Sequence, residues 1–258
     1  MSSDIAYTHV IIDWNFTPAD FFEGPLTVTR EGYTVSLADG KVEARIDGAM
    51  FAARGGMGEQ IQAELEGRFR AAQLLRHETY ALSRGATIKV RPNGTRDIAI
   101  ELQPVACKIA GGTVGILITD PEGKVVYDSE QLRREEDRAL VDRVGAHLAD
   151  SVLVTILKSY GAAVRDPDNE LVYLYEIRDA LSTLFGGDRE ARTALGTSAA
   201  EWRRFGQLCN AEPLRQGRHR GKTLGALRDA TEGELVEART LGKQLLEGYL
   251  AVLDGKGA

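Results

Sequence analysis

The spacing of the apolar residues changes near residue 130, and this change constrains the fold more than any other feature of the chain. Before it, short segments in which every second residue is apolar alternate with turn residues, a pattern typical of half-buried β-strands. After it, apolar residues recur every three or four positions, as on the buried face of a helix. The sequence therefore predicts an α+β fold, with a strand-rich N-terminal domain that contains one long helix and an all-helical C-terminal bundle.

The length of 258 residues suits two ordinary domains, since domains usually hold about 100 to 200 residues. We expect an α+β domain over residues 1–130, a bridging helix over residues 131–165 and a helical domain over residues 166–258. The apolar share of 43% and the charged share of 27% are those of an ordinary globular protein.

Several local signals predict individual elements. The pair Asp39-Gly40 is typical of a two-residue hairpin turn, because both residues accept the positive φ that such a turn requires. Apolar residues three or four apart predict one helix over residues 59–83 and another whose apolar face runs over residues 140–160. His77 lies off the apolar stripe of the first of these helices, so we expect it in solvent.

Two helix starts and one helix end are also marked. Ser198 and Thr231 each begin a capping box, in which a glutamate follows three residues later. Gly186-Gly187 is a typical helix C-terminus, because glycine accepts the left-handed conformation found there.

The composition also sets limits on the class of protein. Cys107 and Cys209 show no metal-ligand spacing, so no metal and no disulfide framework is expected. No segment has the roughly 18 apolar residues that span a bilayer, and the first residues do not resemble a secretion signal. We therefore expect a bacterial protein in the cytoplasm, without a cofactor. The net charge of −6 argues against non-specific coating of nucleic acid.

Positive charge nevertheless gathers between residues 203 and 222, where six basic residues face only Glu212 and leave a net charge of +5. Within this window, residues 210–222 contain a proline and two glycines and are expected to form an irregular connection, here named the basic loop. Guanidinium groups bind phosphate in a planar, bidentate way, and an imidazole can transfer a proton near neutral pH. The candidate catalytic residues are His219 and Arg215, and the candidate phosphate-binding residues are Asn210, Arg218, Arg220 and Lys222.

Arginine and histidine at a junction between helices resemble the HEPN superfamily of small helical domains, many of which are ribonucleases or nucleotide-binding modules of prokaryotic defence and stress systems. The family motif places four to six residues between its arginine and its histidine, whereas Arg215 and His219 are separated by three. The resemblance covers residues 166–258 at most. It implies RNA or nucleotide as the partner, metal-independent RNA cleavage by attack of a 2′-hydroxyl, and a homodimer as the active form.

Other interpretations of the same sequence stay open. The chain could be a non-enzymatic interaction, sensor or immunity-type protein whose N-terminal domain binds a protein partner, with a basic loop that only pairs with acidic helices. A nucleotide-dependent enzyme that uses the glycines of residues 55–58 is a third alternative, although their spacing is not that of a dinucleotide-binding loop. The segment ending in Gly221-Lys222-Thr223 has one residue too few between its glycines for a P-loop.

Overall fold

The computed structural model describes residues 7–100, 117–119, 125–218, 220 and 227–256. Its fold class is α+β, as predicted, with an antiparallel six-stranded sheet in the N-terminal part and helices in the C-terminal part. The chain divides into two compact units. The first comprises Met1–Ala72 and Tyr80–Asp142, and the second comprises Gln73–Thr79 and Arg143–Ala258.

The sheet of the first unit has the strand order β2-β3-β4-β1-β5-β6, and all neighbouring strands are antiparallel. Side chains along β1 and β4 alternate between buried and more exposed positions, as the period of two predicted. The Asp39-Gly40 turn joins β3 to β4 with positive φ at both residues, which confirms the predicted hairpin. The strands are β1 (His9–Thr17), β2 (Leu26–Arg30), β3 (Tyr33–Ala38), β4 (Lys41–Asp47), β5 (Ala81–Val90) and β6 (Arg96–Ile100).

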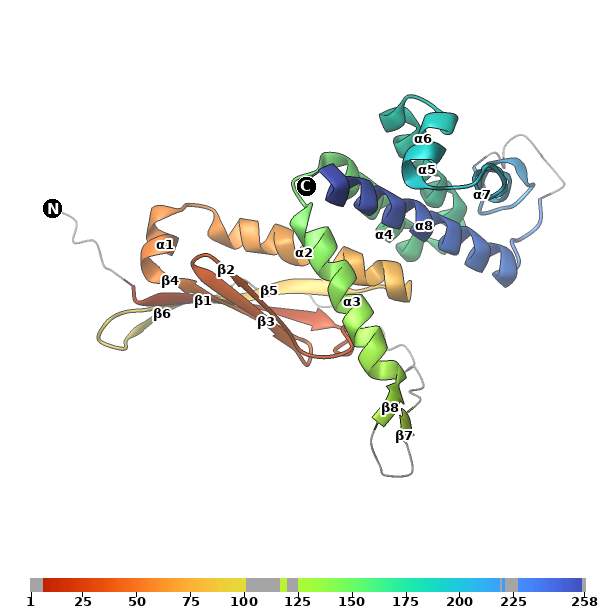
Figure 1. The fold of residues 1–258 in the computed structure, drawn as a ribbon. Helices are drawn as coiled ribbons and strands as arrows, with labels where there is room; N and C mark the ends of the chain where they lie inside the picture. Colours follow the sequence, from red (N-terminus) through yellow and green to blue (C-terminus); the bar gives the residue numbers. More distant parts are fainter. Residues whose placement is uncertain (1–6, 101–116, 120–124, 219, 221–226, 257–258) are drawn as a thin grey trace. The chain divides into compact units, whose positions relative to one another are not determined.

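Helices α1 (Gly48–Ala53) and α2 (Met57–Arg76) lie on the same side of this sheet (Figure 1). Phe69 of α2 is buried, and its ring lies 5.2 Å from that of Phe16 in β1 and 5.4 Å from that of Phe21. Burying an aromatic or aliphatic side chain of this size contributes about 1.5–3 kcal/mol. The apolar stripe of α2 thus attaches the helix to the inner face of the sheet.

Helix α2 ends at Arg76, earlier than the predicted end at residue 83. The physical reason lies at His77, whose φ of 51° is left-handed and ends the α-helical path. The chain then enters β5 at Ala81. Periodicity alone did not reveal this stop, because neither glycine nor proline marks it.

The helical face predicted over residues 140–160 is divided between α3 (Ser129–Ala146) and α4 (Ser151–Arg165). Asp150 causes the break, because its backbone N–H donates to the carbonyl of His147 and its side chain accepts a hydrogen bond of 2.7 Å from the N–H of Leu153. A two-stranded sheet of β7 (Leu117–Thr119) and β8 (Val125–Asp128) precedes α3. The turn predicted at residues 120–123 lies outside the described residues.

In the second unit, α4, α5 and α8 contact one another, and α6 and α7 also contact α8 (Figure 1). The capping boxes at Ser198 and Thr231 are present, and Gly186 caps α5 with a φ of 82°. The remaining elements are α5 (Glu170–Phe185), α6 (Asp188–Leu195), α7 (Ala199–Gly206), α8 (Glu232–Lys256), the 3₁₀ turn η1 (Pro167–Asn169) and the π-helical turn η2 (Gln207–Ala211).

The described part of the chain lacks two kinds of feature. None of its helices combines the length and the apolar composition that a membrane crossing requires. Among the same residues, no three histidine, cysteine or acidic side chains gather as a metal site would need.

Candidate functional site

The described part of the basic loop has a backbone held by hydrogen bonds to both of its neighbours. The N–H of Arg215 donates to the carbonyl of Arg228 at 2.9 Å, and the N–H of Arg228 donates to the carbonyl of Pro213 at 3.1 Å. The N–H of Arg218 donates to the carbonyl of Cys209, in η2, at 3.0 Å. Beyond η2, the described part of the loop is irregular, as predicted, and its backbone is held in place at Arg215 and Arg218.

Arg218 lies against helix α5. The centre of its guanidinium group is 5.1 Å from the centre of the Tyr175 ring, and one of its nitrogens pairs with the carboxylate of Asp179. Arg178 approaches the same ring at 5.2 Å and donates a hydrogen bond of 2.6 Å to its hydroxyl. Cation–π contacts at such partly exposed sites contribute about 0.5–1 kcal/mol each. Tyr175 therefore positions two guanidinium groups on one side of α5.

The other two described arginines of the loop also contact oxygens of their own chain. Arg220 donates to the carbonyls of Asp168 and Arg215, at 3.2 and 3.0 Å, and to the side-chain oxygen of Asn169. Arg215 lies 3.8 Å from the carboxylate of Asp229, and both side chains are more than 60% exposed. A long pair between exposed groups contributes little, about 0–1 kcal/mol. The guanidinium group of Arg215 is thus the more weakly held of these two.

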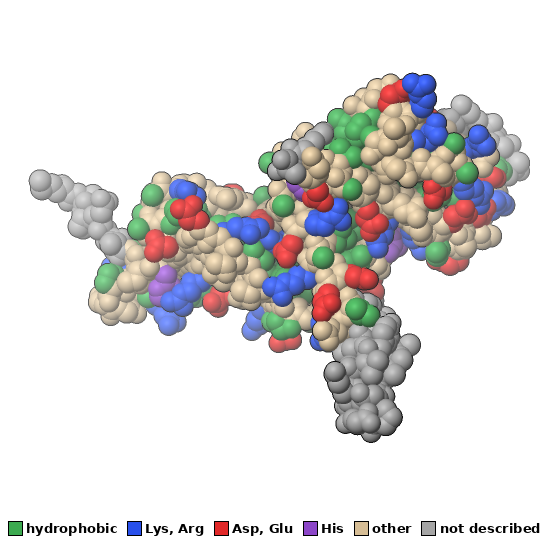
Figure 2. Space-filling model, viewed as in Figure 1, with side chains coloured by type: hydrophobic (Ala, Val, Ile, Leu, Met, Phe, Trp, Pro, Cys, Tyr) green, Lys and Arg blue, Asp and Glu red, His purple; other side chains and the backbone are tan. Residues whose placement is uncertain are grey.

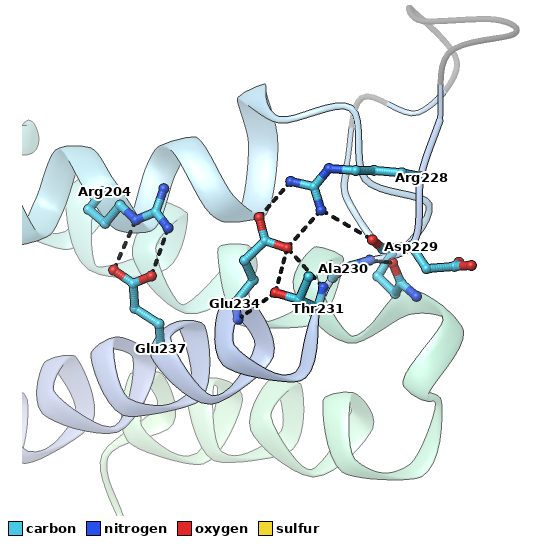
Figure 3. A network of polar contacts seen from close by, with 8 residues as sticks. Arg204, Arg228, Asp229, Ala230, Thr231, Glu234 and Glu237 are labelled. Carbon is cyan, nitrogen blue, oxygen red and sulfur yellow. Dashed lines mark hydrogen bonds and ion pairs between the residues drawn. The ribbon is translucent and has the colours of Figure 1, made fainter.

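The start of helix α8 carries a second set of ion pairs beside the loop (Figure 3). Arg228 forms two hydrogen bonds to Glu234, which also caps the helix at Thr231. These bonds, that of Arg228 first, lower the pKa of Glu234 to about 2. Arg204 pairs with Glu237 in the same bidentate way. Positive and negative side chains accordingly lie interspersed over the visible face of this unit (Figure 2).

Of the three remaining candidates, Asn210 lies among the described residues. His219 and Lys222 lie outside the described residues. Asn210 lies in η2 and is half-buried, and its side-chain oxygen accepts no hydrogen bond from the described residues. Burial raises the pKa of the neighbouring Cys209 thiol and so favours its protonated form.

A buried polar cluster in the same unit was not expected from the sequence. Glu170 is 1% exposed and receives two hydrogen bonds from Arg239, at 2.6 and 2.9 Å. His77 lies 3.4 Å from Glu170 and 3.3 Å from the hydroxyl of Tyr160. The sequence-based expectation that His77 is in solvent was therefore wrong, because its side chain is only 22% exposed.

The electrostatics of this cluster keep the imidazole neutral. Burial, followed by the positive charge of Arg239, lowers the pKa of His77 to about 4. The negative charge of Glu232 acts in the opposite direction but is the smallest of the three effects. Contacts between residues so far apart in the chain leave no local signal in the sequence.

No protein-family model, curated protein or solved structure matched this chain.

Proposed function

We propose that the C-terminal part is a HEPN-like helical bundle that binds the phosphates of RNA or a nucleotide through Arg215, Arg218 and Arg220, with Lys222 as a further cation. The observation that carries the proposal is that Arg215, Arg218 and Arg220 are all exposed and lie within six residues of one another, on a loop whose backbone is hydrogen-bonded at Arg215 and Arg218. Arginine is well suited to this task because its planar donors match the oxygens of a phosphate.

The present partners of these arginines do not prevent phosphate binding. The pairs of Arg218 with Asp179 and of Arg215 with Asp229 join side chains that are roughly half or more exposed. Exposed pairs of this kind contribute about 0–1 kcal/mol. A nucleic-acid strand that contacts several arginines also releases counterions, which is a larger gain at low salt.

RNA cleavage is the catalytic half of the proposal. The 2′-oxygen would attack phosphorus and the P–O5′ bond would break, leaving a 2′,3′-cyclic phosphate and a 5′-hydroxyl. His219 would accept the proton of the 2′-hydroxyl or donate one to the leaving 5′-oxygen, and Arg215 would stabilise the negative charge on the phosphate oxygens. The reaction needs no metal. By the HEPN resemblance, two copies of the chain would act together in a defence or stress system.

The test is a filter-binding titration of a single-stranded RNA over a salt series. If Arg215, Arg218 and Arg220 each neutralise one phosphate, log K falls against log salt with a slope of about −2, and Arg215→Ala/Arg218→Ala reduces its size by about 1.4. Arg189→Ala is the matched control, because Arg189 is 83% exposed and pairs only with its neighbour Glu190 among the described residues. Equal slopes for the wild type and the double variant would contradict the binding proposal.

The catalytic half has its own test. His219→Ala should abolish cleavage of a labelled RNA while leaving binding in place, and chelation of divalent metals should not change the wild-type rate. An unchanged rate in His219→Ala would contradict the role of this residue.

A second candidate function is a non-enzymatic protein-interaction partner, and two observations favour it. Each described arginine of the basic loop already contacts an oxygen of its own chain. In the first unit, a pocket of about 200 Å³ with apolar walls at Phe22, Pro25 and Val141 lies between the segment after β1 and helix α3. Under this alternative, the native protein co-purifies with a protein partner and without nucleic acid, and Val141→Glu releases that partner.

A further inference from the structure

We propose that Asp179 competes with phosphate for Arg218, and that the loop selects a strand with successive phosphates over a free phosphate or mononucleotide because each of its described arginines is already paired. This inference rests on the proposed function and adds the ligand class and a residue that lowers the affinity for phosphate. It follows from the way in which each described arginine of the loop is already occupied.

Asp179 occupies the donors that a phosphate would need. It lies on α5, one turn after Tyr175, and its carboxylate pairs with a terminal nitrogen of Arg218 while the Tyr175 ring contacts the same guanidinium group. Carboxylate and phosphate oxygens are recognised by the same N–H groups of arginine. A phosphate that uses this edge of Arg218 must therefore displace Asp179.

The displacement is feasible because the pair is open to water. The side chains of Arg218 and Asp179 are 46% and 47% exposed. The strength of exposed ion pairs corresponds to a competition of about two- to fivefold in a binding constant. Asp179 thus weakens phosphate binding without blocking it.

The same occupation disfavours small ligands. Arg215 pairs with Asp229, and Arg220 donates to Asn169 and to two backbone carbonyls. A single phosphate that replaces one of these contacts gains little over the contact it breaks. A strand replaces several of them but loses its translational freedom only once, so its contacts reinforce one another.

The experiment compares Asp179→Asn with the wild type in binding a single-stranded RNA of ten nucleotides, inorganic phosphate and AMP. Asp179→Asn should bind the RNA about two- to fivefold more tightly, and both proteins should bind phosphate and AMP far more weakly than RNA. Glu176→Gln is the matched control, because it removes the same charge from α5 at a residue that accepts a hydrogen bond from Ser159. Its affinity for RNA should change less than that of Asp179→Asn.

The outcomes separate the two proposals. If Arg218→Ala weakens RNA binding but Asp179→Asn binds like the wild type, or Glu176→Gln gains as much, the competition by Asp179 is refuted and the proposed function stands. If AMP binds as tightly as the RNA, the selection of a strand is refuted. If neither protein binds RNA, phosphate or AMP, both the inference and the proposed function fail.

Discussion

Acidification from pH 7 to pH 5 should destabilise the helical unit through His77. The native protein holds this imidazole neutral, with a pKa of about 4, whereas in the unfolded chain it titrates near 6.5. The unfolded state therefore binds the proton first as the pH falls. The contribution of the neutral His77 to the free energy of unfolding is fully present above pH 6.5 and is lost progressively towards pH 4.

The size of the effect follows from these two pKa values. Without solvent screening, a group with this pKa shift would lower the free energy of unfolding by almost 2 kcal/mol between pH 7 and pH 5. His77 is 22% exposed, and solvent screens part of its interactions. We therefore expect a loss of about 1 kcal/mol.

The assay is urea unfolding followed by circular dichroism at both pH values, in the wild type and in His77→Asn. Asparagine tolerates the left-handed backbone of residue 77, where φ is 51°, and does not titrate. The carboxylates of the chain contribute equally to the pH dependence of both proteins. The difference in pH dependence between the wild type and His77→Asn therefore isolates the effect of the histidine. A loss of stability that is as large in His77→Asn as in the wild type would refute the reasoning.

Two further predictions concern stability. Arg239→Leu leaves the buried carboxylate of Glu170 without its charged partner and should lower the free energy of unfolding in urea by about 3 kcal/mol. Glu170→Leu/Arg239→Leu should recover most of the loss. A double variant no more stable than the single one would contradict this. Gly48→Ala would place a methyl group in steric overlap with the carbonyl oxygen of Tyr7 and should cost about 1–3 kcal/mol. The methyl group of Gly55→Ala would meet no atom of the described residues within 4 Å, apart from those of the adjoining residues, and should be nearly neutral. Equal melting temperatures for the two glycine variants would count against the backbone packing.

Much of the fold could be predicted because local signals and tertiary packing agree. The Asp39-Gly40 turn, the capping boxes at Ser198 and Thr231 and the glycine end of α5 all depend on neighbouring residues and are present as predicted. The left-handed stop at His77 and the break at Asp150 were missed, because each lies within a sequence whose apolar spacing continues past it.

The candidate site was less predictable than the fold. The concentration of arginines in one loop is visible in the sequence, but their partners are not. Asp179 and Tyr175 reach Arg218 from a helix about forty residues away in the chain. The cluster of Glu170, His77 and Arg239 likewise joins segments that no local pattern relates.

Chemical shifts of the arginine side chains test the central claim most directly. In a protein labelled with ¹⁵N, single-stranded RNA should shift the Nε–Hε signals of Arg215 and Arg218 in a saturable way and leave that of Arg189 unchanged. Signals of Arg215 and Arg218 that stay in place, while RNA binds elsewhere or not at all, would contradict the assignment of the basic loop as a phosphate-binding site.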